Sequence, residues 1–357
     1  YRDTFWTDHY AIHQETKEGI LQRWARMYRV KRWDRYAPLT PRAQQKIPGV
    51  AYVMVKMKDL DADSKHASNP RRRPLTPYGG KGKQRHPLVR IMKMCGAVLR
   101  TAMVDAGLRS WNLERCSDFA TQLSEVWRAA AKEGAGQQHA RRRVFPFDVR
   151  AMFTELDKNA VRAAVRSVLR HNAGWKKQQR QRGLTARYPK RAFVGCKQGR
   201  WYARVGQGCR LRKGETILPF RVVEQVVEFD LVESVMSCGT HIVTQKFGIP
   251  MGSFLSAILA GLTVAMAEHR FYLTLPPRVA ARVKGLRFAD DGMAIIEEWA
   301  GVESAASIFQ RFVDGCYPAP LELEVEEHQG RFSFLECEVY VGGEQAWAIH
   351  RSKNWDR

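Results

Sequence analysis

The sequence has few cysteines, and they are not arranged as a zinc site or a disulfide framework. Its seven cysteines are an odd number, no two form a Cys-x-x-Cys pair, and none lies in a cluster with histidine. This pattern favours free, buried thiols in a reducing compartment and predicts no zinc site. The chain begins with Tyr1 and not Met, so a targeting segment or a further domain could precede it. The compartment stays open, with the nucleus or an organelle favoured over secretion.

Long hydrophobic runs are also missing. The most apolar stretch covers residues 254–267, which is shorter than the roughly 20 residues needed to span a bilayer. It is rich in small residues and follows closely after Pro250. We therefore expect no membrane insertion, and a helix that packs closely inside a domain. We find no internal repeat and no long low-complexity tract.

Acidic residues are scarce relative to basic ones. Lys and Arg number 59 against 36 Asp and Glu, which gives a formal net charge of +23. A field of this size favours a polyanionic partner, either nucleic acid or an anionic membrane surface. Charge alone leaves another interpretation open, a ribosomal-type or otherwise sticky basic protein. The hydrophobic content of 45% is that of a folded protein.

The patterns that are present predict an α+β fold, because helices and strands are mixed without regular βαβ alternation. A chain of 357 residues is long enough for two or three structural units. The expected helices cover residues 15–35, 88–105, 117–132, 157–171, 253–271 and 304–316. The expected strands cover residues 51–59 and 144–150, with two more in each of 282–296 and 321–341. A basic loop is expected at 64–85, and a hairpin near Gln198 within the basic segment 175–213.

Two adjacent carboxylates, Asp290 and Asp291, lie at the apex of an otherwise apolar hairpin. Asp-Asp-Gly is by itself an ordinary turn sequence. Asp148 favours a cation site over an ordinary turn, because it ends another apolar strand. The two strands side by side would bring three carboxylates to one edge. Three carboxylates in one place demand cations. Two Mg²⁺ ions about 4 Å apart, or Mn²⁺ instead, would activate a primer 3′-hydroxyl and stabilise the leaving pyrophosphate.

Four stretches resemble the palm motifs of reverse transcriptases, in the order of that family. FDVRAMFTEL at 147–156 resembles the first motif and QKFGIPMGSFLS at 245–256 the second. FADD at 288–291 resembles the metal-binding hairpin, and FLE at 334–336 is similar to the primer-grip strand. Within the superfamily, the first two stretches look most like Penelope-like retroelements and the related domesticated cellular reverse transcriptases.

The resemblance implies a right-hand polymerase with fingers and palm and a short or absent thumb. It implies an N-terminal helical region and fingers at 1–140, and the first part of the palm at 141–172. A basic fingers or insert region at 173–245 and the second part of the palm with the primer grip at 246–357 would follow. Because the chain ends shortly after the primer grip, we expect either a fragment or a protein or RNA partner that holds the duplex.

By resemblance, Asp148 and Asp290 would be the principal metal ligands, with Asp291 and Val149 beside them. Phe153, five residues after Asp148, would lie beneath the incoming sugar. A ring at this place collides with a 2′-hydroxyl and so selects deoxynucleotides. A plain core role for Phe153 is the alternative.

The resemblance also implies contacts to the substrates. Met251 and Gly252 would touch the nascent base pair and template, although tight helix packing explains the same small residues. Arg72 or one of its neighbours, Arg71 and Arg73, would bind the triphosphate. The residues expected to contact the nucleic acid are Lys56, Arg73, Arg162, Arg166, Phe334 and Leu335. The lysine that often serves as general acid for pyrophosphate is missing from residues 324–330, which leaves His328 or Arg331.

The function that follows is RNA-templated DNA synthesis, in which a primer is extended with dNTPs. The expected partners are therefore an RNA template, a primer duplex and dNTP. Two rival functions stay open. The first is an RNA-dependent RNA polymerase, which Phe153 disfavours. The second is a non-catalytic nucleic-acid-binding scaffold, which the presence of all three aspartates disfavours.

Overall fold

The computed structural model describes residues 9–41, 52–55, 72–75, 87–133, 141–181, 190–205, 210–233, 235–238, 240–299, 303–342 and 345–350. The chain divides into two compact units. The first unit comprises Tyr1–Gly107 and Phe153–Leu262, and the second comprises Leu108–Met152 and Thr263–Arg357. The chain passes between the two units after Gly107, after Met152 and after Leu262.

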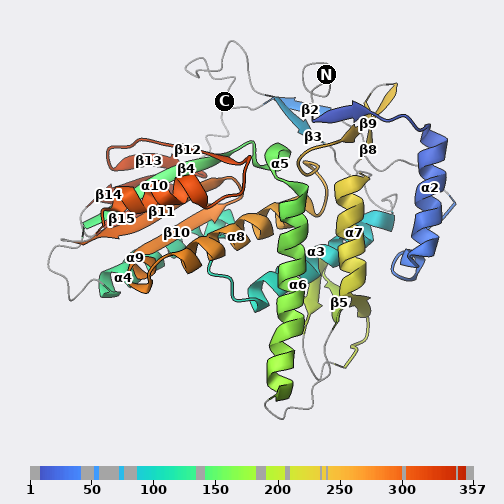
Figure 1. Ribbon diagram of the computed structural model, residues 1–357, viewed down its shortest axis with the longest axis horizontal. Coiled ribbons are helices and arrows are strands. Elements are labelled where there is room, and N and C mark those ends of the chain that lie inside the picture. The colour runs from blue at the N-terminus through green and yellow to red at the C-terminus, as the bar shows by residue number, and fades with distance from the viewer. Residues whose placement is uncertain are drawn as a thin grey trace. The chain divides into compact units, whose positions relative to one another are not determined.

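The second unit is built on a four-stranded antiparallel sheet with the order β10-β11-β4-β12 (Figure 1). Its strands are β4 (Arg141–Arg150), β10 (Val283–Phe288), β11 (Asp291–Glu298) and β12 (Glu322–Val325). A separate antiparallel sheet follows in the chain, formed by β13 (Arg331–Phe334), β14 (Cys337–Gly342) and β15 (Gln345–His350). Residues 321–341, expected to hold two strands, therefore contain three.

Both faces of the four-stranded sheet are covered within the second unit. On one face, aromatic rings from α10 (Ala305–Gly315) pack on β4, with the Phe145 and Phe309 rings stacked at 4.4 Å and Phe147 at 5.5 Å from Phe312. On the other face, α4 (Phe119–Glu133) and the β13-β14-β15 sheet share a buried cluster with Val144, Met293 and other residues of the central strands. α9 (Pro277–Arg282) leads into β10.

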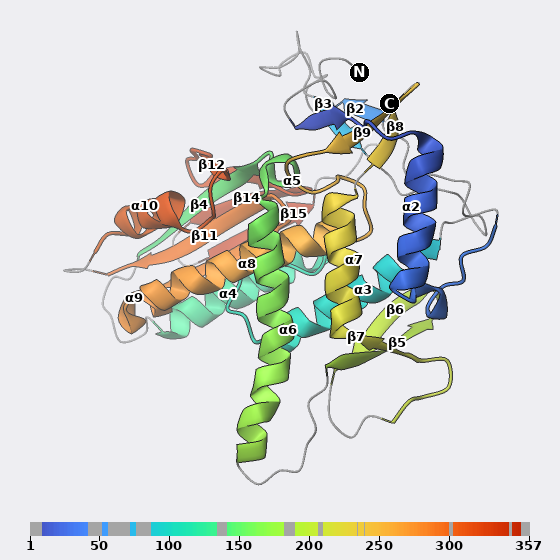
Figure 2. The same cartoon turned by 45° about the vertical axis from the view of Figure 1, so that its right-hand side comes forward.

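The first unit contains three helices that contact one another, α3 (Pro87–Asp105), α6 (Lys158–Gln181) and α7 (Phe220–Val232). Figures 1 and 2 both show α6 beside α7. Its sheets have the orders β6-β5-β7, β1-β9-β8 and β2-β3. Their strands are β1 (Tyr10–Ile12), β2 (Tyr52–Val55), β3 (Arg72–Leu75), β5 (Arg191–Lys197), β6 (Arg200–Arg204), β7 (Thr216–Pro219), β8 (Val235–Cys238) and β9 (His241–Gln245).

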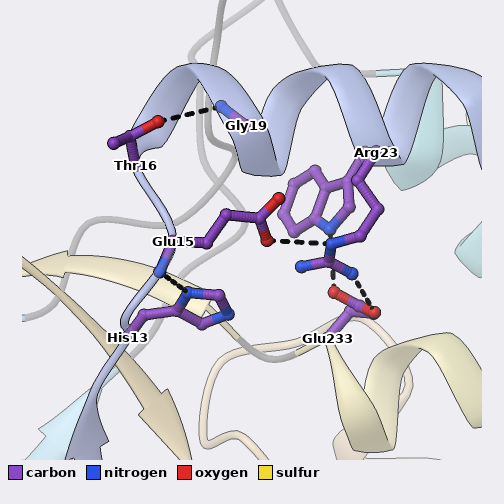
Figure 3. A network of polar contacts seen from close by, with 7 residues as sticks. His13, Glu15, Thr16, Gly19, Arg23 and Glu233 are labelled. Carbon is purple, nitrogen blue, oxygen red and sulfur yellow. Dashed lines mark hydrogen bonds and ion pairs between the residues drawn. The ribbon is translucent and has the colours of Figure 1, made fainter.

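The N-terminal helix α2 (Lys17–Val30) packs on α7 through aromatic residues at helical spacing. Trp24 is buried, and its ring lies 5.2 Å from that of Phe229. Its indole N–H donates to Glu233 at 3.0 Å, and Arg23 bridges Glu233 and Glu15 (Figure 3). The aromatic residues Trp24 and Tyr28 of this helix are therefore core residues.

Several local expectations need correction. Arg72, Arg73 and Pro74 lie in β3 and not in a loop, because this stretch pairs with β2 in the register Val55↔Arg72. β4 continues to Arg150, so Asp148 lies inside a strand and does not end one. α6 continues to Gln181, into the basic segment, and no helix was expected where α7 lies.

One further expectation, the hairpin near Gln198, is confirmed. The hairpin is formed by β5 and β6. The described cysteines are free thiols, but Cys116 and Cys196 are exposed and not buried as expected. Among the residues that the structure describes, no helix is both long and apolar enough to cross a membrane.

Candidate active site

The acidic candidates of the second unit meet on neighbouring strands. β4 lies between β11 and β12, and Asp148 is the direct partner of Asp291 on one side and of Glu324 on the other. The Val149 N–H donates to the Asp290 carbonyl at 2.9 Å. The Asp148–Asp291 pair is therefore of the non-hydrogen-bonded kind, whose Cα atoms approach to about 4.5 Å. The expectation that the strand of Asp148 lies beside the Asp290-Asp291 hairpin is confirmed.

These three side chains share one face of the sheet, because directly opposed residues of antiparallel strands point to the same side. We call Asp291, Asp148 and Glu324 the acidic row. Asp148 and Asp291 are half-buried, and Glu324 is exposed. The next pair on the same face, Pro146 and Met293, is buried. The acidic row therefore lies where the apolar core of this face ends.

The Asp-Asp-Gly sequence is not the turn that its composition suggests. Phe288 pairs with Asp291, so the two turn residues are Ala289 and Asp290. Gly292 lies in β11 opposite Phe147, and a Cβ at this position would lie 2.3 Å from Cζ of the Phe147 ring. The glycine after the two aspartates is therefore a packing requirement of the aromatic face.

The primer-grip candidate lies on the same side of the second unit as the acidic row. β13 and β14 are joined by a turn at Leu335 and Glu336, and Phe334 is buried with its ring 4.7 Å from that of Phe119. Burial raises the pKa of the Cys116 thiol, and the negative charges of Glu336 and Asp291 raise it further. Phe334 shares a buried cluster with Met293, which lies on the same face of β11 as Asp291, so the turn borders the face that carries the acidic row.

The acidic row suits an open magnesium site better than a closed one. As the side chains lie, the described residues contain no group of three or more His, Cys, Asp or Glu that could hold a metal ion. Mg²⁺, however, is usually bound by one or two carboxylates, with waters and substrate phosphates as the other ligands. The facing pair of Asp148 and Asp291, with Asp290 in the adjoining turn, supplies that kind of donor set. It does not supply a closed structural site.

In the first unit, the segment expected as the second palm motif docks on the backbone of Phe153 and Thr154. The Ile249 N–H donates to the Phe153 carbonyl at 2.7 Å. Gly248 has φ 69°, and a Cβ at this position would lie 2.3 Å from the Thr154 carbonyl oxygen. Both the backbone conformation and the close approach require glycine here. The first and second motifs therefore meet through main-chain contacts.

Buried polar side chains hold this segment in place. The Gln245 amide, which is 1% exposed, donates to the carbonyls of Phe247 at 2.8 Å and Ile249 at 3.2 Å. Lys158 donates to the Gln245 carbonyl at 2.8 Å, and burial lowers the pKa of Lys158 to about 8. These contacts fix the backbone on the approach to Pro250.

The turn that follows is anchored by a fully buried aspartate. The Ser253 hydroxyl donates to Asp230 of α7, with both carboxylate oxygens at 2.8 Å. Just before it, Met251 is half-buried and Gly252 is exposed with φ 117°. The two residues expected to touch the nascent base pair therefore lie on a rigidly held turn of the first unit, ahead of α8 (Ser256–Thr274).

The residues expected to contact nucleic acid have different surroundings. Lys56 and Arg71 lie outside the described residues, and only the backbone of Arg72 and Arg73 is described. Arg162 makes a bidentate pair with Glu228 of α7, at 2.7 and 2.9 Å. Its neighbour on the same helix face, Arg166, is exposed. Of these two arginines, Arg166 is therefore better placed than Arg162 to contact a phosphate.

Both general-acid candidates have partners in the second unit. His328 lies 2.9 Å from the Val144 carbonyl oxygen, and Arg331 donates to Glu338 at 2.8 Å. Glu268 and Arg287 form a buried pair that was not expected from the sequence, and their side chains are both 0% exposed. A single acidic residue in the apolar stretch of α8 and a single arginine in an apolar strand were the signals that could have found it.

Comparison with known proteins yields structural likeness only. No protein-family model matches the chain, and no curated protein matches its sequence. Telomerase from Candida tropicalis, solved in complex with a TWJ fragment of telomeric RNA, matches with a TM-score of 0.54 and 10% identity over 94% of this chain and 49% of that chain. Telomerase from Candida albicans, also solved with a TWJ fragment of telomeric RNA, matches with a TM-score of 0.53 and 12% identity over 89% of this chain and 50% of that chain. The Sicinivirus 3Dpol RNA-dependent RNA polymerase matches with a TM-score of only 0.46 and 9% identity over 92% of this chain and 56% of that chain. A likeness this low supports no conclusion about the fold.

The likeness to telomerase, a reverse transcriptase, shows the fold. The chain spans about half the length of these telomerase chains. It has a nucleic-acid polymerase fold, and the expected mixture of helices and sheets is confirmed.

Proposed function

We propose that this chain is an RNA-templated DNA polymerase that extends a primer 3′-hydroxyl with dNTPs. The observation that carries the proposal is the direct pairing of Asp148 with Asp291, with Asp290 in the adjoining turn. Two facing carboxylates at the end of an apolar sheet face are a suitable cradle for cations that arrive with a triphosphate. The net charge of +23 and the likeness to telomerases solved with RNA support a nucleic-acid substrate.

The residues have distinct roles in this proposal. Asp148, Asp290, Asp291 and the main-chain oxygen of Val149 would hold two Mg²⁺ ions, which would activate the primer hydroxyl and stabilise the pyrophosphate leaving group. β4 and β11 hold the carboxylates in place before any substrate binds, because their register is continuous from Asp148↔Asp291 to Arg141↔Glu298. The turn at Leu335 and Glu336 would position the primer end beside them.

The choice of DNA as product rests on Phe153. Its half-buried ring would lie beneath the incoming sugar and exclude a 2′-hydroxyl. In this proposal the chain is divided into fingers and palm, like a right-hand polymerase. Met251 and Gly252 would contact the nascent base pair, and Arg72 or a neighbour would bind the triphosphate. The wording of the first two palm motifs further supports a relationship to Penelope-like retroelements or domesticated cellular reverse transcriptases.

A primer-extension assay tests the proposal. The chain is incubated with a primed RNA template, Mg²⁺ and either dNTPs or rNTPs, beside the variants Asp148→Asn and Glu298→Gln. Glu298 is the matched control, because it lies at the far end of the same β4–β11 pair. We expect extension with dNTPs, loss of extension in Asp148→Asn, and unchanged extension in Glu298→Gln. Extension with rNTPs alone would favour an RNA polymerase, and binding of the primed template without extension would favour a scaffold.

A further inference from the structure

A fully buried ion pair lies in the second unit close to the aspartate hairpin. Arg287 of β10 donates from Nε to Glu268 of α8 at 2.5 Å, and neither side chain is exposed. Removing two charges from water is expensive, and a buried pair of this kind is often no more stabilising than well-packed apolar residues. Stability alone is therefore a weak explanation for an arginine in this apolar strand.

The second unit satisfies this pair with further hydrogen bonds. Glu268 accepts the Trp111 N–H at 2.9 Å and the Tyr317 hydroxyl at 2.9 Å. The main-chain N–H of Arg287 donates to the main-chain carbonyl of Trp111 at 2.6 Å, and the main-chain carbonyl of Arg287 accepts the Leu113 N–H at 2.7 Å. Gly285 lets the Trp111 indole lie against β10, since a Cβ there would be 2.1 Å from Cδ2 of the ring. Both the backbone and the side chain of Arg287 are therefore held in place.

One donor of the guanidinium is aimed at the hairpin turn. Nη1 of Arg287 donates to the Ala289 carbonyl at 2.9 Å. Ala289 is the first turn residue and has φ 55°, in the left-handed region that favours glycine. A non-glycine residue in this conformation is strained and persists only when its surroundings impose it. The bond from Arg287 to the carbonyl that precedes Asp290 is such a constraint.

We propose that Arg287, anchored by Glu268, is a positioning residue that fixes the backbone of the hairpin turn and so the placement of Asp290 and Asp291 for metal binding. The inference rests on the proposed function in that it takes these aspartates as metal ligands. Lysine cannot replace arginine in this role, because one ammonium group cannot reproduce the planar fork that contacts Glu268 and Ala289 together.

The test compares Arg287→Lys with Arg282→Lys. Arg282 is the matched control because it is also buried in the second unit and also donates to carbonyls, those of Glu297 at 2.8 Å and Glu303 at 3.0 Å, but it precedes β10 at the end remote from the turn. Mn²⁺ binding is measured by electron paramagnetic resonance at a temperature where all proteins are folded, with Asp148→Asn to identify site-specific binding. Primer extension is measured on the same samples.

We expect Arg287→Lys to weaken the Asp148-dependent Mn²⁺ binding by about 10- to 100-fold, the usual cost of losing a group that orients metal ligands. Arg282→Lys should change it less than about twofold. Equal losses in the two variants would overturn the inference, as would the absence of Asp148-dependent binding in the unaltered chain. If the chain binds Mn²⁺ as expected but extends no primer, the polymerase proposal fails and the positioning role of Arg287 stands.

Discussion

Asp148 of β4 lies directly opposite Asp291 of β11, as a non-hydrogen-bonded pair in a continuous antiparallel register. Like charges in this position repel, and they destabilise a sheet by a few tenths to about 1 kcal/mol. Keeping the two aspartates opposed therefore lowers the stability of the sheet, and it provides a negatively charged site for cations. When one aspartate is neutralised, stability should not fall, whereas activity should be lost.

Replacing Asp148 with Asn should therefore give a protein that is inactive but not less stable. We expect the free energy of unfolding without metal to stay constant or to rise by up to about 1 kcal/mol, because the repulsion from Asp291 is removed. Primer extension should fall by more than the roughly 10- to 100-fold that loss of an outer metal partner costs. Urea denaturation and extension assays on the same preparation check both, and a loss of stability would show that Asp148 is mainly structural.

Mg²⁺ should stabilise the unaltered chain against unfolding. At a concentration of about 100 times the dissociation constant, a ligand that binds only the folded state adds about 2.7 kcal/mol. Asp148→Asn should lose this stabilisation, and Glu298→Gln, at the far end of the same strand pair, should keep it. Thermal unfolding with and without Mg²⁺ is the measurement. An equal rise in melting temperature in all three proteins would assign the metal effect to another place.

Gly248→Ala, in the segment expected as the second palm motif, should lower the free energy of unfolding more than Gly199→Ala does in the β5–β6 hairpin. Both glycines have positive φ, 69° and 76°, so each alanine brings a backbone cost of roughly 1 kcal/mol. Only at Gly248 would the new Cβ collide, 2.3 Å from the Thr154 carbonyl, which adds about 1–3 kcal/mol. Chemical denaturation of both variants gives the difference, and equal losses would contradict the close approach.

Because Lys158 is half-buried, we expect the free energy of unfolding to depend on pH in the alkaline range. Burial lowers the pKa of its ammonium to about 8, from 10.5 when unperturbed. Below pH 8 the group is charged in both states, so the cost of burying it is fully present. Between pH 8 and 10.5 the folded chain releases the proton and the unfolded chain keeps it, so stability relative to Lys158→Met should rise with pH. Urea denaturation of both proteins across pH 7–11 checks the slope, and a constant difference would rule it out.

The amino-acid pattern was sufficient to predict the elements that carry the candidate site. Apolar runs beside Asp148 and on both sides of Asp290 and Asp291 predicted strands that bring these carboxylates to one edge, and β4 and β11 pair as this pattern requires. The amphipathic α2 was equally visible, because Trp24 and Tyr28 recur at helical spacing.

Other features could not be predicted from local pattern, because long-range pairing decides them. Nothing near Glu324 signals that β12 pairs with β4 and extends the acidic row, since this register depends on a partner far away in the chain. Asp-Asp-Gly suggested a turn through composition, while the contact of Gly292 with the Phe147 ring requires the glycine for a different reason. Arg72 lies in a strand because β2 pairs with it, although its basic, proline-containing surroundings favour a loop.

The double variant Glu268→Gln with Arg287→Met separates the stability of the buried pair from its positioning role. Removing Glu268 alone leaves the Arg287 charge buried without a partner, which costs about 3–5 kcal/mol. Removing both charges avoids this penalty, and the glutamine oxygen can still accept the Trp111 N–H. We therefore expect the double variant to unfold within about 1–2 kcal/mol of the unaltered chain, and the single variant Glu268→Ala to be far less stable.

Recovered stability should not bring recovered metal binding, because methionine cannot donate to the Ala289 carbonyl. The double variant should bind Mn²⁺ about 10- to 100-fold more weakly than the unaltered chain. Denaturation and Mn²⁺ titration on one sample make the comparison, since each protein then serves as its own folding control. A double variant that is stable and binds Mn²⁺ normally would mean that Ala289 holds its left-handed conformation unaided and that the ion pair serves packing alone.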